Sequence, residues 1–394
     1  MDPVKNPFSP GAGAHPPELV GRQEVLEQAR ILVARVKEGR SGKSILLTGL
    51  RGVGKTVLLN EIRQRAHQAG YRSMLIETPE ETGLVKRLTI ELRSLLLEMD
   101  RASRRAIKVR KALGTLKAFV GAVKVRYGEL ELGLDIDPEQ GVADSGDLEA
   151  DLTALFEAVG EASRECQSPV ILLIDELQYA KEVEFRSLIM AMHRLQQARL
   201  PFTMTGAGLP SLPGLAGRAR SYAERLFEFI PMGPFSESEA DRAIREPLRA
   251  EGQGIDPPAL KEIFRMTEGY PYFLQEWGYQ TWNHAESSPI TLKDVREASG
   301  DAIRQLDRGF FRVRFDRLTL GERRFLRAMA VLGKGPQQLG AIASKLDMKT
   351  TSLGPVRSSL ITKGMIFSPE YGKLEFTVPL FDDYMKRTMT GPTA

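Results

Sequence analysis

Short apolar runs alternate with longer stretches of helical periodicity over residues 1–235. The clearest apolar runs are 44–48 and 170–174, each closed by glycine or acidic residues, as is typical of strands buried in a parallel sheet. Further runs at 73–76, 202–205 and 226–229 fit shorter strands, and helical patterns of about 10–20 residues separate them. This alternation predicts an α/β fold with a doubly wound sheet.

From residue 236 onward the hydrophobic pattern is helical. Ser236 and Glu239 form a capping box, in which each side chain satisfies a free backbone N–H group at a helix start. A second helix is expected over about 258–266, and the helical pattern continues to about residue 307. We therefore predict an all-helical second domain, a lid, over residues 236–309.

The last part of the chain has a third pattern. Thr319 and Glu322 cap a predicted helix that ends at Leu332, and shorter helices are expected around 339–346 and 351–363. Two short apolar segments then flank a turn at 369–372. Three helices followed by a hairpin predict a winged helix-turn-helix domain over residues 310–394.

Residues 101–151 form a charge-segregated insertion in the first domain. All charged residues from Arg101 to Arg126 are basic, and all charged residues from Glu129 to Asp151 are acidic. Alternation around Gly128 is compatible with a β-hairpin over 123–132. Either the opposite charges neutralise one another on a solvated helix and loop, or the insertion contacts a neighbouring subunit or nucleic acid.

The composition excludes several classes of site. Cys166 is the single cysteine, so the chain holds neither an internal disulfide nor a cysteine-based zinc site. The four histidines are scattered and form no H-E-x-x-H pattern. The chain has no apolar run of membrane-spanning length and no signal-peptide pattern at its start, so we expect no membrane span and a cytoplasmic location.

A phosphate-binding motif follows the first predicted strand. Residues 49–56, Gly-Leu-Arg-Gly-Val-Gly-Lys-Thr, fit the P-loop pattern G-x-x-x-x-G-K-[ST]. Its glycines let backbone N–H groups face the phosphates, while Lys55 reaches the β- and γ-phosphates and Thr56 ligates Mg²⁺. The motif predicts binding of ATP with Mg²⁺, and the expected contacts are Gly49, Gly52, Val53, Gly54, Lys55, Thr56 and Val57.

Two carboxylates end the predicted strand at 170–174. Asp175 and Glu176 would lie at the carboxyl edge of the sheet, where ligands bind in open α/β sheets. Asp175 is expected to hold Mg²⁺ and Glu176 to polarise the attacking water. Acidic residues are also common at helix starts, but the P-loop earlier in the chain favours the catalytic interpretation.

The order of these features resembles the AAA+ ATPases of the origin-recognition-like type. It is also similar to the related signal-transduction ATPases of the STAND class and to archaeal-type ATPases. The resemblance covers nearly the whole chain, from Pro16 to Arg387, and its most specific parts are the two motifs above. It implies an ATPase, which converts ATP and water to ADP and phosphate.

The resemblance implies further site residues. Val20 and Arg22 belong to a segment that would lie over the adenine, and Thr205 would be a sensor-1 residue near the γ-phosphate. Arg225 would be an arginine finger that acts on the nucleotide of a neighbouring subunit. Each residue has an alternative. The segment with Val20 and Arg22 could simply be a proline-led helix start, and Thr205 could be a threonine that packs inward. Arg225 could form a local salt bridge to Glu224 or another acid.

The lid departs from the origin-recognition pattern, which supplies an arginine sensor 2. Gly269 and Pro271 look more like the glycine-x-proline turn of STAND and archaeal-type ATPases, in which the proline region packs against the nucleotide. An ordinary proline in the first helical turn is the alternative. This departure speaks against an arginine sensor 2 and against a hexameric motor.

The charge balance points to a partner for the third domain. Residues 310–390 hold fourteen Lys and Arg against seven Asp and Glu, a difference of +7, whereas the whole chain has a net charge of +4. A basic end suggests a polyanion, and we expect Arg357, Lys363 and Lys373 to contact double-stranded DNA. The alternative is a signalling or scaffold ATPase whose winged helix contacts a protein. A nucleotide-dependent homo-oligomer is plausible in either case.

Overall fold

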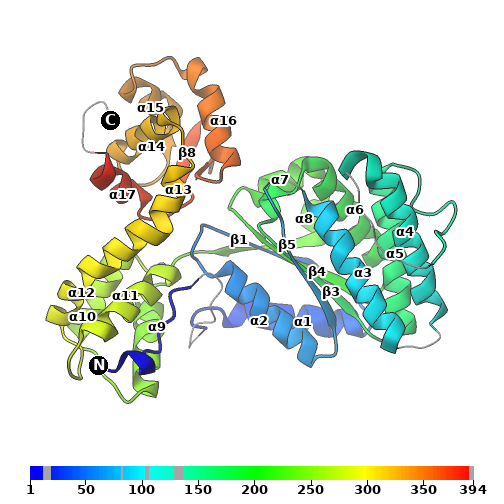
Figure 1. The fold of residues 1–394 in the computed structure, drawn as a ribbon, viewed down its shortest axis with the longest axis horizontal. Coiled ribbons are helices and arrows are strands. Elements are labelled where there is room, and N and C mark those ends of the chain that lie inside the picture. The colour runs from blue at the N-terminus through cyan, green and yellow to red at the C-terminus, as the bar shows by residue number, and fades with distance from the viewer. Residues whose placement is uncertain (12–18, 81–82, 103–105, 128–135, 390–394) are drawn as a thin grey trace. The chain divides into compact units, whose positions relative to one another are not determined.

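The computed structural model describes residues 1–11, 19–80, 83–102, 106–127 and 136–389 (Figure 1). The chain divides into two compact units. One unit comprises Arg22–Thr48 and Lys55–Pro231, and the other comprises Met1–Gly21, Gly49–Gly54 and Met232–Ala394. No helix among the described residues is long and apolar enough to cross a membrane.

A five-stranded sheet forms the centre of the first unit, with the strand order β2-β3-β4-β1-β5. The pairs β2–β3, β3–β4 and β4–β1 are parallel, and every residue of β1, β3 and β4 is buried. Apolar strands buried on both faces are what the sequence pattern predicts, so the α/β prediction is confirmed. The strands are β1 Ser44–Gly49, β2 Arg72–Glu77, β3 Val170–Asp175, β4 Phe202–Gly208 and β5 Phe227–Met232.

Helices cover both faces of this sheet (Figure 1). Figure 1 shows α1 and α2 on one side of the sheet and α3 to α6 on the other. The apolar stripes of α3 to α6 face the strands and one another in one continuous core. The helices of this unit are α1 Gln23–Lys37, α2 Lys55–Gln68, α3 Leu84–Ala102, α4 Ile107–Tyr127, α5 Leu148–Glu165, α6 Glu182–Gln197, α7 Leu212–Ala219 and α8 Ala223–Leu226.

The hairpin expected over 123–132 is wrong in its first half. Residues 123–127 form the end of helix α4, and residues 129–132 lie outside the described part of the chain. The reason is a helical spacing of buried residues, since Val109, Leu113, Leu116 and Val120 are all buried in the core. That three-to-four-residue spacing outweighs the short alternation at the helix end.

The second unit begins with a helical bundle. The Ser236–Glu239 capping box is present at the start of α9, as predicted. The six residues between α12 and α13 form a π-helix, labelled η3, a rare form that occurs frequently at functional sites. These elements are η1 Pro3–Lys5, α9 Glu237–Ala250, α10 Pro257–Thr267, α11 Pro271–His284, α12 Leu292–Gln305, η3 Leu306–Phe311 and α13 Arg312–Asp316.

The C-terminal elements follow the predicted order. The Thr319–Glu322 capping box starts α14, and β8 pairs antiparallel with both β6 and β7. Phe311, Phe381 and Tyr384 pack ring against ring in a core shared with the helical bundle. The elements are α14 Leu320–Leu332, β6 Gln337–Gln338, α15 Leu339–Lys345, η4 Thr350–Leu353, α16 Gly354–Thr362, β7 Ile366–Phe367, β8 Lys373–Phe376 and α17 Phe381–Thr388.

Candidate active site

The P-loop connects β1 to α2 and depends on its glycines. Gly52 and Gly54 have φ of +83° and +90°, a region that side-chain-bearing residues rarely adopt. A Cβ atom on Gly49 would lie 2.3 Å from the carbonyl oxygen of Met232, so only glycine fits there. The helix begins directly after the loop, at Lys55, so its free N–H groups are available to an anion.

The two predicted motifs meet at Thr56 and Asp175. Thr56 Oγ1 donates a hydrogen bond to Asp175 Oδ2 at 2.5 Å. Lys55 and Asp175 are both 7% exposed. Val57, the residue after Thr56 in α2, is half-buried. A hydroxyl and a carboxylate at one point form the kind of hard oxygen set that Mg²⁺ takes beside nucleotide phosphates. The donor set therefore fits Mg²⁺.

Asp175 carries a charge in an unfavourable place. Burial raises the pKa of its carboxyl, and the neighbouring Glu176 carboxylate acts in the same direction. The hydrogen bond from Thr56 and the charge of Lys55 oppose that rise in pKa. A divalent cation at this position would compensate the buried negative charge.

Glu176 is held in a strained conformation by its neighbours. Its φ is +51°, in the left-handed region, and its backbone N–H donates to Asp175 Oδ1 at 2.8 Å. Gln178 Nε2 donates to Glu176 Oε2, and Gln178 Oε1 accepts from the N–H of Leu209 at 3.0 Å. Gln178 thus fixes the Glu176 carboxylate to the segment after β4. Sequence reasoning missed Gln178, although its place three residues after Asp175 was visible.

Thr205, the predicted sensor-1 residue, lies inside β4 rather than at its end. It is opposite Leu173 in β3, two residues before Asp175, which is about 7 Å along a strand. Its hydroxyl is buried and has no hydrogen-bond partner in the described part of the chain. Thr205 thus lies before the level of Asp175, and its sensor-1 role stays a prediction.

The arginines before β5 differ in their surroundings. Arg220 forms an ion pair with Glu149, which Arg186 also approaches to 3.3 Å. Arg225 is exposed on α8, and its guanidinium has no ion pair with any described residue. The alternative of a salt bridge from Arg225 to Glu224 is therefore absent from the described structure.

The start of the lid helix α11 touches the P-loop. Pro271 occupies the first position of α11, and the N–H of Tyr272 donates to the carbonyl oxygen of Gly52 at 3.1 Å. The Tyr272 ring stacks on Phe310 of the π-helix, with ring centroids 4.8 Å apart. This contact places the predicted lid turn beside the phosphate-binding loop.

The adenine segment spans both units, and the C-terminal elements contact the P-loop. Val20 is completely buried in the helical core, whereas Arg22 is the N-cap residue of α1 in the other unit. Pro17 and Glu18 of the same segment lie outside the described residues. The N–H of Arg51 in the P-loop donates to the carbonyl oxygen of Thr377, just after β8, at 3.1 Å.

Two of the three predicted DNA contacts are engaged in ion pairs. Lys363 Nζ lies 2.7 Å from the buried Glu322 carboxylate, and Lys373 Nζ lies 2.8 Å from Glu370. Arg357 is half-buried. In contrast, Lys345 and Lys349 are exposed, and their ammonium groups contact no acid within the described residues. Sequence reasoning gave these two lysines no role.

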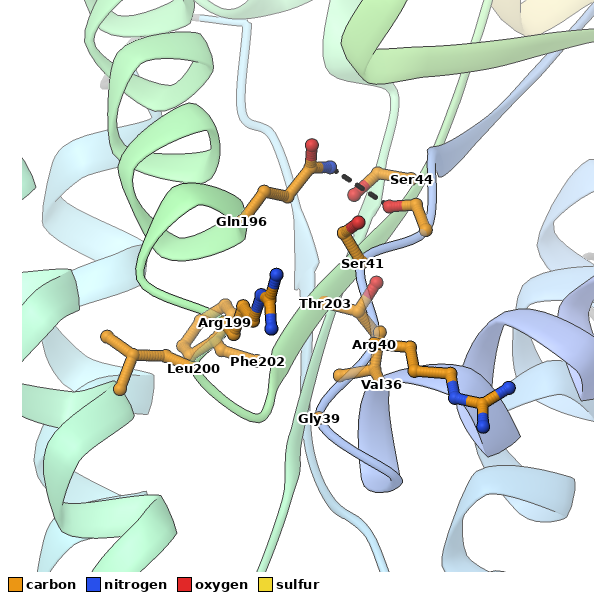
Figure 2. Close-up of a pocket in the computed structure, with 11 residues that line it drawn as sticks. Val36, Gly39, Arg40, Ser41, Ser44, Gln196, Arg199, Leu200, Phe202 and Thr203 are labelled. Atoms are coloured by element: carbon orange, nitrogen blue, oxygen red, sulfur yellow. Dashed lines mark hydrogen bonds between the residues drawn. The ribbon is translucent and has the colours of Figure 1, made fainter.

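A small cavity lies at the opposite edge of the sheet (Figure 2). Ser44, Phe202 and Thr203, at the amino ends of β1 and β4, line it, and Gln196 Nε2 donates to the carbonyl oxygen of Gly42 beside it at 3.0 Å. Its volume of about 10 Å³ is close to that needed for one water molecule. The cavity is too small for a nucleotide and lies away from the P-loop.

Two family models match the sequence. Residues 18–204 match the AAA ATPase domain, and residues 308–385 match a domain of unknown function, DUF8462. No curated protein matches the sequence. The AAA match covers the P-loop and the Asp175–Glu176 pair, and thus both motifs from which ATP binding was predicted.

Solved structures with a similar fold include a Walker-type ATPase of Pyrococcus abyssi. The TM-score is 0.60 at 16% identity, over 93% of this chain and 96% of that chain. The Thermotoga maritima RuvB Holliday junction branch migration motor has a TM-score of 0.46 at 16% identity, over 95% of this chain and 99% of that chain. The Aeropyrum pernix ORC1 protein in complex with DNA has a TM-score of 0.46 at 15% identity, over 95% of this chain and 94% of that chain. At such identities the likeness concerns the fold alone.

Proposed function

We propose that this chain, whose residues 18–204 match the AAA ATPase domain, hydrolyses MgATP as a switch that is coupled to a C-terminal winged helix. The observation that carries the catalytic part is the hydrogen bond between Thr56 and Asp175, with Glu176 next to it. This hydrogen bond joins the hydroxyl of the P-loop, which would bind Mg²⁺, to the carboxylate at the end of β3.

Each side chain of the site has a separate role in phosphoryl transfer. Lys55 neutralises the β- and γ-phosphates, and the Gly52 and Gly54 turns direct backbone N–H groups at them. Thr56 and Asp175 would hold Mg²⁺, which supplies positive charge beside the phosphates. Glu176, oriented by Gln178, accepts a hydrogen bond from the attacking water and aligns it with the γ-phosphate.

Contacts of the P-loop support the coupling. The loop bonds to α11 through Gly52 and to the segment after β8 through Arg51. A nucleotide would bind to the same loop that makes these two backbone hydrogen bonds. Nucleotide binding and the two contacts would therefore influence each other. STAND and archaeal-type ATPases remain the groups that the lid turn at Pro271 most resembles.

The C-terminal elements support a winged helix-turn-helix. Helices α14, α15 and α16 precede the β7–β8 hairpin, and β6 adds a short third strand. We propose that this domain associates with double-stranded DNA, with Arg357 as a contact in addition to the predicted Lys363 and Lys373. Lys345 and Lys349, which pair with no acid among the described residues, would be further contacts. The second candidate, a scaffold ATPase, is favoured by the ion pairs of the last two lysines.

The catalytic proposal is tested with Glu176→Gln and Lys55→Ala. Glu176→Gln should retain ATP binding and lose hydrolysis by at least about 100-fold, because a positioned general base contributes about 10²–10⁴. Lys55→Ala should lose tight ATP binding. Binding is measured with a fluorescent ATP analogue and hydrolysis by phosphate release, with Glu286→Gln as a surface control. Hydrolysis by Glu176→Gln at the parent rate contradicts the assignment.

A further inference from the structure

The turn between β7 and β8 exposes one aromatic ring completely. Tyr371 has a relative exposure of 105%, and no ring contact of Tyr371 is present among the described residues. Tyrosine usually buries much of its ring, and it is enriched where proteins bind partners. The ring therefore has its whole surface available for a ligand.

The backbone that carries this ring is fixed on several sides. Ser368 Oγ lies within hydrogen-bond distance of the carbonyl oxygens of Glu370 and Lys373, at 2.7 and 2.9 Å. The N–H of Lys373 donates to Glu370 at 3.1 Å, and the N–H of Leu339 donates to Gly372 at 3.0 Å. A ligand that stacks on Tyr371 would not have to order the turn first, which lowers the cost of binding.

The charges nearby in the sequence favour a polyanion. No Asp or Glu occurs from Met348 to Pro369, the stretch that contains α16 and leads into the turn, and Glu370 beside Tyr371 is paired with Lys373 at 2.8 Å. The same stretch contains Lys349, Arg357 and several exposed hydroxyl groups, which suit phosphate oxygens. An exposed aromatic ring in such a domain fits a nucleic-acid base, since every base offers a face for stacking.

We propose that Tyr371 stacks on an unpaired base of DNA, so that the C-terminal domain prefers DNA in which a duplex adjoins a single strand. The faces of bases inside a duplex are covered by their neighbours, so a stacking ring gains most where bases are unpaired. This inference rests on the proposed association of the C-terminal domain with DNA.

The experiment compares two labelled DNAs by fluorescence anisotropy on the full-length protein. One is a blunt duplex, and the other is a fork with the same duplex and two unpaired arms. Tyr371→Ala should weaken binding to the fork about 5- to 150-fold, the range for loss of one stacked base. Its affinity for the blunt duplex should stay within about two-fold, and Tyr371→Phe should bind the fork like the parent. Val331→Ala, which shortens an exposed apolar residue on α14, is the matched control.

The outcomes separate this inference from the function on which it rests. If both DNAs bind and Tyr371→Ala leaves the fork-to-duplex ratio unchanged, the stacking role is refuted while DNA association stands. An equal loss on both DNAs also refutes it, since it assigns the ring to the duplex. If neither DNA binds at about 50 mM salt, with or without ATP, DNA association fails, and a protein partner takes its place.

Discussion

At the residue scale, the buried carboxylate of Asp175 lowers the stability of the folded protein when it is charged. Its carboxylate is buried beside Glu176, and burial raises its pKa. A raised pKa in a carboxyl group means that the folded state holds the proton more tightly than the unfolded state does. The charged carboxylate therefore costs stability above that pKa, and the cost disappears as the pH falls below the unfolded value of about 3.9.

Asp175→Asn should consequently stabilise the protein without nucleotide while abolishing Mg²⁺-dependent hydrolysis. The amide keeps an oxygen for Thr56 but carries no buried charge. We expect the melting temperature at pH 7.5 to rise by a few degrees, since 1 kcal/mol corresponds to about 2–4 °C in a domain of this size. Thermal unfolding from pH 4 to 8 measures the effect, with the exposed Glu286→Gln as control. A decrease in melting temperature at neutral pH would contradict the account.

At the element scale, local pattern was sufficient for most helices and strands but not for every contact. The strand at 170–174 and the P-loop were predictable because their chemistry lies within a few adjacent residues. The bond between Gln178 and Glu176 was harder to foresee, because it depends on a short turn and on the end of β4. The hairpin at 123–132 is wrong in its first half, because the helical spacing of the apolar residues from Val109 to Val120 continues as α4 to Tyr127 and outweighs the short alternation.

Lys363 illustrates the same limit, because its role depends on a partner elsewhere in the chain. The sequence places it at the end of a predicted recognition helix, but in the structure its ammonium group contacts Glu322 at 2.7 Å and the carbonyl oxygen of Arg317 at 3.0 Å. Burial works to raise the pKa of Glu322, but the hydrogen bonds from Lys363 and Ser359 outweigh it and lower the pKa to about 2.

Lys363→Ala should therefore destabilise the C-terminal elements. Removing one partner of a buried ion pair costs about 3–5 kcal/mol, and the partial exposure of Lys363 favours the lower end. Because the pKa of Glu322 is lowered from about 4.3 to about 2, the loss should be full above pH 5 and shrink as the pH falls toward 2. Urea unfolding measures it, with the exposed Lys349→Ala as control. Unchanged stability of Lys363→Ala would show that the pair contributes little and would leave the lysine free for DNA.

At the scale of the whole molecule, the position of Arg225 bears on whether one chain forms a complete active site. The described residues supply the P-loop, the proposed magnesium ligands Thr56 and Asp175 and an oriented Glu176, but no arginine of the lid is assigned to the γ-phosphate. Arg225 is exposed and has no ion pair within the described structure, as is expected of a residue that acts on another copy. Arg220, by contrast, is bonded to Glu149.

If Arg225 completes the site of a neighbouring copy, hydrolysis per subunit should rise with protein concentration. Arg225→Ala should then lose much of the rate, because arginine fingers contribute about 10³–10⁵. A mixture of Arg225→Ala and Lys55→Ala should regain part of the activity, since the Lys55→Ala copy offers an arginine to the intact P-loop of the other. Phosphate release at increasing concentrations measures both effects, and Arg218→Ala, another exposed arginine before β5, should behave like the parent. A rate per subunit that is constant down to nanomolar protein, with no recovery in the mixture, would instead indicate a site that a single chain completes.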